Sequence, residues 1–234
     1  MRIVDAMAAT GDTHSGVLFL DLDGTLADSG AGITQALNEV LAGIGGSLLS
    51  PEEQRWIIGP PFQTTMPTIL RTRGLDESMS QWVIDEYRRV YTEHHLPHTP
   101  RIDGIGDVVD ELANSYLLAV VTAKPTNQAR IAVESLDMHD RFEVVVGPEP
   151  DHPVPKAVLL RRAIAHIENS LSAPLDYASC WMIGDRHHDI DAAVEVGTKS
   201  VGVLWGFGDT EELETAGATA IATVPTDLLS ILLR

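Results

Sequence analysis

Residues 17–26 read VLFLDLDGTL, in which four apolar residues, Val17 to Leu20, end abruptly at the acidic residues Asp21 and Asp23. A short run of branched apolar residues without alternation is typical of a strand buried on both faces of a parallel sheet. Gly24 follows directly and permits a tight backbone turn. The stretch therefore predicts a buried strand that carries two carboxylates to a turn at its carboxyl end.

Other apolar runs of the same character follow along the chain, with helical patterns between the later ones. The runs are Leu117–Val121, Phe142–Val146, Cys180–Ile183 and Ser200–Leu204. Apolar spacing predicts helices over residues 126–136, 155–167 and 189–196. This alternation predicts an α/β fold with a doubly wound, Rossmann-like parallel sheet and right-handed crossovers.

One long segment, residues 30–99, breaks the alternation because it carries helical patterns and no strand pattern. Ile33, Leu37, Val40 and Leu41, for example, lie on one face of a helix. We therefore predict a small all-helical cap domain, residues 30–99, inserted into an α/β core formed by residues 16–29 and 100–234. Residues 1–15 are expected to be an N-terminal tail.

The charge of the chain limits the partners that we expect. Of its 234 residues, 34 are acidic and 16 basic, which gives a formal net charge of −18. A surface this negative repels nucleic acid and anionic lipid, so we expect neither as a partner. A phosphorylated substrate would also be repelled unless cations are concentrated locally, which points to a metal site.

Cysteine content and hydropathy indicate the compartment. Cys180 is the single cysteine, so the chain forms no intramolecular disulfide, and its apolar neighbours predict a core position. No segment approaches the roughly 18 consecutive apolar residues of a membrane span. We expect a soluble cytoplasmic protein, monomeric or homodimeric.

The residues that end the predicted strands carry the chemistry, because ligands of an open parallel sheet bind outside the carboxyl ends of its strands. Asp21 and Asp23 end one strand, Thr122 another and Asp185 a third, while Lys156 begins a helix. Crowded carboxylates repel one another and need a cation. Hard oxygen ligands that leave positions open for water and phosphate suit Mg²⁺.

Such a set of groups can transfer a phosphoryl group. Asp21 can attack phosphorus, and Asp23 can protonate the leaving oxygen and later activate water. Thr122 and Lys156 can hold the phosphoryl oxygens, over which charge spreads in the transition state. Gly24 lets backbone amides turn toward the phosphate.

These residues resemble the four signatures of the haloacid dehalogenase superfamily in its phosphatase form. In chain order they are Asp21-Leu22-Asp23-Gly24-Thr25-Leu26, Thr122, Lys156 and Gly184-Asp185-Arg186-His187-His188-Asp189. The resemblance implies that Asp21 is the nucleophile and Asp23 the acid/base. It also implies that Mg²⁺ binds the Asp21 side chain, the backbone carbonyl of Asp23 and the Asp185 side chain. Asp189 would support these ligands without binding the ion directly, or would act through a water molecule.

Further stretches resemble the phosphoglycolate phosphatase-like branch, whose helical cap lies at the same place in the chain. They are Ile57-Ile58-Gly59-Pro60-Pro61, Thr122-Ala123-Lys124-Pro125 and residues 202–208. The branch implies a small phosphorylated substrate, and phosphoglycolate, nucleoside monophosphates, sugar phosphates and phosphotyrosine stay open. The proline-rich loop 147–155, before Lys156, departs from the family, and Lys124 is the alternative cation for the phosphate.

The remaining candidates for substrate binding lie beside these signatures and in the insert. Gly59 and the prolines after it predict a helix start whose free amides face the substrate, with Gln63 and Arg71 or Arg73 selecting it. Beside the phosphate we expect Gly24, Thr25, Ala123 and Lys124. The adjacent His187 and His188 are expected to face solvent, because neighbouring side chains on a helix point about 100° apart.

Other functions would use some of the same residues. A phosphosugar mutase of the β-phosphoglucomutase type would use the same aspartates, and a non-catalytic binding module would use the same fold. A dehalogenase needs neither Asp23 nor Mg²⁺. A calcium-binding loop starting at Asp21 would need glycine at its sixth position and an acid at its twelfth, where this chain has Leu26 and Gly32.

Overall fold

The computed structural model describes residues 15–233, so the predicted N-terminal tail lies outside the described residues except for Ser15. The described chain forms one sheet of six parallel strands in the order β3-β2-β1-β4-β5-β6. The strands are β1 (Val17–Leu20), β2 (Leu117–Val121), β3 (Val144–Val146), β4 (Cys180–Gly184), β5 (Lys199–Val203) and β6 (Ala220–Ala222). This confirms the predicted fold class and adds β6, which the sequence pattern did not indicate.

Strand order reverses at β1, which lies between β2 and β4. Leu20 is in register with Val120 on one side and with Ile183 on the other. Chain connections run from β1 toward β3 on one side and from β3 back toward β6 on the other. Ligands of such sheets bind at this reversal, outside the carboxyl ends of the strands.

Helices cover both faces of the sheet, which explains why the strands are apolar without alternation. Leu18 and Leu20 face one cluster, together with α6 (Ile105–Leu112), α7 (Thr126–Ser135) and α11 (Asp227–Leu232). Val17 and Phe19 face the other, together with α8 (Lys156–Leu171) and α9 (His187–Val196). α10 (Thr210–Thr215) follows β5. Right-handed crossovers place helices on opposite faces when connections run in opposite directions.

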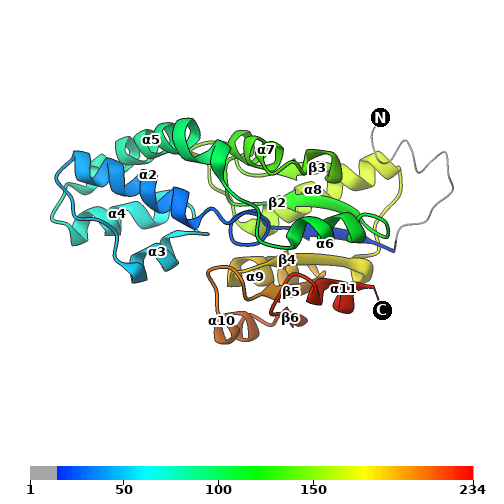
Figure 1. Ribbon diagram of the computed structural model, residues 1–234. Coiled ribbons are helices and arrows are strands. Elements are labelled where there is room, and N and C mark those ends of the chain that lie inside the picture. The colour runs from blue at the N-terminus through cyan, green and yellow to red at the C-terminus, as the bar shows by residue number, and fades with distance from the viewer. Residues whose placement is uncertain (1–14, 234) are drawn as a thin grey trace.

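The insert between β1 and α6 is helical. Its long helices are α2 (Gly30–Gly43), α3 (Pro51–Ile57), α4 (Phe62–Thr72) and α5 (Ser80–Val90), and short helical turns follow up to His98. These four helices gather at one end of the molecule (Figure 1). No helix within residues 15–233 combines the length and the apolar character that crossing a bilayer requires.

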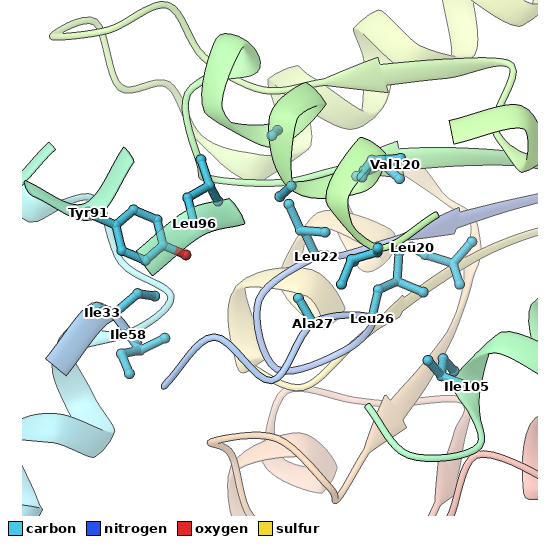
Figure 2. Close-up of a cluster of buried hydrophobic side chains, with 14 of the residues drawn as sticks. Leu20, Leu22, Leu26, Ala27, Ile33, Ile58, Tyr91, Leu96, Ile105 and Val120 are labelled. Atoms are coloured by element: carbon cyan, nitrogen blue, oxygen red, sulfur yellow. The ribbon is translucent and has the colours of Figure 1, made fainter. Parts of the chain in front are cut away.

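Apolar packing continues from the sheet into the insert. Figure 2 shows Leu20, Leu22 and Leu26 on the sheet side of a cluster that extends to Ile33 and Tyr91 in the insert. Burying the apolar surface of such side chains stabilises by roughly 25 cal/mol per Å². Packing thus holds the insert over the end of β1, while its division from the core as a separate domain stays a prediction.

Arg73 ties α3, α4 and the loop before α3 together. Its side chain is only 3% exposed and pairs with Glu53 at 2.8 Å. Its guanidinium also donates to the carbonyl oxygens of Ser47 (2.7 Å), Leu48 (3.1 Å) and Ile69 (3.0 Å). Arg73 therefore stabilises the insert and does not reach the substrate, contrary to one of the roles expected for it.

We expect Arg73→Met to lower the free energy of unfolding by about 3 kcal/mol, because it leaves a carboxylate and several carbonyls without a donor. Arg71→Met, on the exposed face of the same helix, is the matched control and is expected to change it by less than about 0.5 kcal/mol. Urea unfolding of both variants measures the difference. Equal values for the two variants would contradict this role.

Candidate active site

The loop after β1 directs two carboxylates away from the sheet edge. The Asp21 amide donates to the Ile183 carbonyl at 2.9 Å and so continues the strand pairing by one residue. The Leu22 carbonyl then accepts from the amides of Leu26 and Ala27, both at 2.9 Å. Gly24 adopts a φ of 79°, which favours glycine. The residues of the first signature thus form one closed turn.

Three buried aspartates meet at this end of the sheet. The carboxylates of Asp21, Asp185 and Asp189 offer oxygens within 4.8 Å of one another. Asp185 follows β4, and Asp189 lies in the first turn of α9. Asp185 accepts a hydrogen bond from the Phe207 amide at 2.7 Å through Oδ2, while its buried Oδ1 has no hydrogen-bond partner. The cluster is therefore a buried site rich in carboxylate oxygens, of which Asp185 Oδ1 accepts no hydrogen bond.

Burial and crowding disfavour the ionised forms of these acids. Burial raises the pKa of Asp21 to about 6 even though the Lys156 ammonium favours its charged form, and Asp189 adds to the rise. Burial, followed by the charges of Asp21 and Asp189, also raises the pKa of Asp185 well above its usual value. Positive charge placed between them would reverse both effects.

Lys156 supplies part of that charge. Its Nζ lies 2.7 Å from Asp21 Oδ1 and 2.8 Å from Asp189 Oδ1. Burial alone would lower the pKa of Lys156, but the two carboxylates outweigh it and raise the pKa above its usual value. As the first residue of α8, Lys156 reaches the site although a proline-rich loop precedes it.

Lys124 forms an ion pair with Asp23, the second aspartate of the turn. Its Nζ lies 3.1 Å from Asp23 Oδ2 and donates to the Tyr91 hydroxyl at 3.4 Å. Burial opposes the charge of Lys124, but Asp23 and then Tyr91 raise its pKa above its usual value. Lys124 and Lys156 thus pair with different aspartates, and the choice between them as the lysine that holds the phosphate stays a prediction.

A cavity lies between the turn and the insert. Asp21, Asp23, Thr122, Ala123 and Lys124 line it from the core, and Gly59 and Gln63 line it from the insert. Thr122 is almost completely buried, and its hydroxyl accepts from the Lys124 amide at 3.2 Å. A second cavity lies on the other side of Asp21, against Lys156 and Asp189. The structure thus brings most of the predicted residues to one place.

Three predicted substrate-binding residues lie elsewhere. Arg71 is 60% exposed in its side chain, pairs with Glu77 at 3.4 Å and does not line the cavity, so its assignment was wrong. Arg71 lies on the exposed face of α4, and the arginine that lines the cavity from the insert is Arg88 of α5. Thr25 is completely buried beneath the turn, and Gly24 packs against Asp185. Both lie in the turn that holds Asp21 and Asp23, and their contact with the phosphate stays a prediction.

The histidine pair corrects another expectation. His187 and His188 are half-buried, and their ring centroids lie 3.8 Å apart, so neighbouring side chains here do not diverge. His187 Nδ1 lies 2.7 Å from Glu212 Oε1. Burial, with the charges of His187 and Arg186, lowers the pKa of His188 to about 4. The two rings pack on each other at the start of α9, while the His187 side chain keeps 39% of its surface exposed.

Several residues at the site gave no sequence signal of their role. Arg88 and Asp151 meet across 63 positions of sequence, at 2.6 Å. Arg186 donates to the Ile58 carbonyl of the insert at 2.7 Å and pairs with Glu212 at 2.9 Å. Charges on an amphipathic helix or in a loop are usually solvated, so pattern alone does not identify such pairs.

Known proteins resemble the chain over most of its length. The family model described as haloacid dehalogenase-like hydrolase matches residues 17–203. Tyrosine-protein kinase PtkA of Mycobacterium tuberculosis is 31% identical over 94% of this chain and 72% of its own length. A 5'-nucleotidase of Pseudomonas aeruginosa is 31% identical over 86% of this chain and 87% of its own. The crystal structure of a predicted phosphatase from Clostridium acetobutylicum superimposes with a TM-score of 0.81, at 28% identity, over 95% of this chain and 99% of its own.

The chain therefore belongs to the haloacid dehalogenase-like hydrolases. Phosphatases recur among its relatives and structural neighbours, and the chain is a phosphatase of this family.

Because Lys156 joins Asp21 to Asp189, we expect Lys156→Met to lower kcat by about 100-fold or more. The control is Lys199→Met, which removes a lysine that stacks on Trp181 at the far end of β5. Phosphate release from phenyl phosphate, with thermal unfolding of each variant as a folding check, measures the effect. Full activity of a folded Lys156→Met protein would contradict the role.

Proposed function

We propose that the chain is a Mg²⁺-dependent phosphomonoesterase that transfers the phosphoryl group to Asp21. The observation that carries the proposal is the convergence of Asp21 with Lys156, Asp185 and Asp189 beneath a cavity. A nucleophilic carboxylate, a fixed cation and further acids are the parts that phosphoryl transfer requires.

The donor set fits Mg²⁺. All candidate ligands are oxygens, which are the atoms that this hard cation prefers to bind. The buried Asp185 Oδ1 accepts no hydrogen bond. Asp21 and Asp185 would hold the ion with the Asp23 carbonyl, and Asp189 would support them. When bound, Mg²⁺ supplies positive charge that offsets repulsion among the carboxylates and polarises the phosphoryl oxygens.

In the first step that we propose, an Asp21 oxygen forms a bond to phosphorus as the bond from phosphorus to the leaving oxygen breaks. Asp23 donates its proton to that oxygen, and the alcohol departs. In the second step Asp23 takes a proton from water, and the water oxygen displaces Asp21 from phosphorus. Inorganic phosphate leaves, and both aspartates return to their starting states.

The surrounding residues position these groups. Lys156 and Thr122 hold phosphoryl oxygens where negative charge spreads in the transition state. Lys124, at 3.1 Å from Asp23 Oδ2, fixes the direction of the acid/base. A phosphosugar mutase would use the same two aspartates but would need an activating phosphosugar and would hydrolyse slowly. We further propose a small phosphorylated partner in the cytoplasm and neither nucleic acid nor membrane.

We expect phosphate release from phenyl phosphate to require Mg²⁺ and to stop with EDTA. Asp21→Asn should lower it by at least about a thousandfold, because the amide does not replace the nucleophile. Mass spectrometry after an acid quench should find the phosphoryl group on the peptide that contains Asp21. Mass spectrometry of a tyrosine peptide incubated with the protein and ATP tests the activity in the name of the mycobacterial relative, because a kinase transfers the phosphoryl group to the peptide and releases no inorganic phosphate. Activity without Asp21 or Mg²⁺ would contradict the proposal.

Gly206 gives a separate test of the metal site. A Cβ atom there would lie 2.3 Å from Asp185 Oδ2, so alanine displaces that carboxylate. We expect Gly206→Ala to weaken Mg²⁺ binding by about tenfold or more in titration calorimetry. Gly43→Ala, where a Cβ meets nothing within 4 Å, is the matched control. Unchanged Mg²⁺ affinity in Gly206→Ala would show that Asp185 does not hold the ion.

A further inference from the structure

The positive charges that line the cavity toward the insert are already paired with acids. Among its described lining residues the cations are Lys124 and Arg88. Lys124 is paired with Asp23 at 3.1 Å, and Arg88 is paired with Asp151 at 2.6 Å. Glu149 also lines the cavity and adds a negative charge. A second anionic group on the substrate would therefore meet no available cation on this side.

Asp151 is held in a fixed position against Arg88. The Gln81 side-chain amide donates to the same Asp151 oxygen at 2.8 Å, so two residues of α5 hold one carboxylate. Asp151 lies in the proline-rich loop after β3 with a φ of 64°, a left-handed conformation that is uncommon for residues other than glycine. The loop and α5 thus meet at this ion pair, with Arg88 only 19% exposed in its side chain.

Apart from Gly59 and the side-chain amides of Gln63 and Gln128, the rest of this wall is apolar and aromatic. Phe62 and Tyr87 pack edge to face, with ring centroids 4.6 Å apart, and both line the cavity. The other apolar lining residues from the insert and the proline-rich loop are Ile33, Ile58, Pro60, Pro61, Pro148 and Pro153. Aromatic rings bury large apolar groups with defined geometry. Such walls bind an apolar or aromatic group and offer little to a solvated anion.

We propose that the substrates are phosphomonoesters of uncharged alcohols with an apolar or aromatic part, and that the Arg88–Asp151 pair excludes a second anionic group. The inference rests on the proposed function, because it places the phosphate at Asp21 and the alcohol against the insert. A nucleoside or an aryl alcohol fits this description. Phosphoglycolate does not, because its leaving group carries a carboxylate.

Asp151 is then the residue that determines specificity, through Arg88. With Asp151 present, the Arg88 guanidinium is neutralised and a substrate carboxylate meets Asp151 and Glu149. Arg88 also contacts Asp85 of α5, but at 3.4 Å and with the Asp85 side chain 57% exposed. Without the Asp151 charge, Arg88 can therefore form a charge-assisted hydrogen bond with a carboxylate on the substrate. Removal of one acid should therefore extend the substrate range to anionic alcohols.

Two esters that differ by one carboxylate test this directly: phenyl phosphate and 4-carboxyphenyl phosphate. We expect the wild-type protein to favour phenyl phosphate by about tenfold or more in kcat/KM. Asp151→Asn should reduce this preference by about tenfold or reverse it, and Asp151→Asn with Arg88→Gln should restore it. Glu86→Gln, which removes another acid of α5 from its pair with Arg89, is the matched control.

The outcomes separate the two proposals. Equal wild-type rates on the two esters would overturn the inference while leaving the proposed function in place. A ratio that Asp151→Asn leaves unchanged, in a protein with wild-type thermal stability, would overturn it as well. Absence of Asp21-dependent phosphate release from both esters would overturn the proposed function and the inference with it.

Discussion

Repulsion among buried carboxylates is the constraint on which the rest of the site depends. Asp21 follows β1, whereas Asp185 and Asp189 lie in one segment after β4, and the parallel sheet brings the two segments together. Burial raises the pKa values of Asp21 and Asp185, so the cluster is stable in its charged state only with cations beside it. Lys156 is one of them, and an acidic protein of net charge −18 binds a phosphate only where such cations are concentrated.

Close packing of the backbone makes this crowding possible. A Cβ on Gly206 would lie 2.3 Å from an Asp185 oxygen, and one on Gly184 would lie 2.1 Å from the Asp189 carboxyl carbon. Glycine at both positions leaves room for the two carboxylates between neighbouring loops. The amide of Phe207 then orients Asp185 through one oxygen and leaves the other unused.

Local pattern predicted the parts of the structure that depend on near neighbours in sequence. The apolar runs gave β1 to β5, and the residues after them gave Asp21, Thr122 and Asp185, because a parallel sheet aligns strand ends. The pattern missed β6, whose short run Ala220–Ala222 is only partly buried. It also placed Arg71 wrongly, since the direction of a side chain depends on how α4 packs. Ion pairs such as Arg88 with Asp151 depend on folding and have no local signal.

The insert contacts the charged groups of the site. The Tyr91 hydroxyl accepts a hydrogen bond from Lys124, which pairs with Asp23, so a side chain of the insert touches the cation beside the proposed acid/base. Arg186 reaches from the fourth signature to the Ile58 carbonyl in the insert. Contacts of both kinds join the insert to the groups that act on phosphorus. A shift of the insert would therefore act on the position of Asp23 through Tyr91 and Lys124, so the proposed alcohol-binding walls and the proposed acid/base are connected by direct contacts.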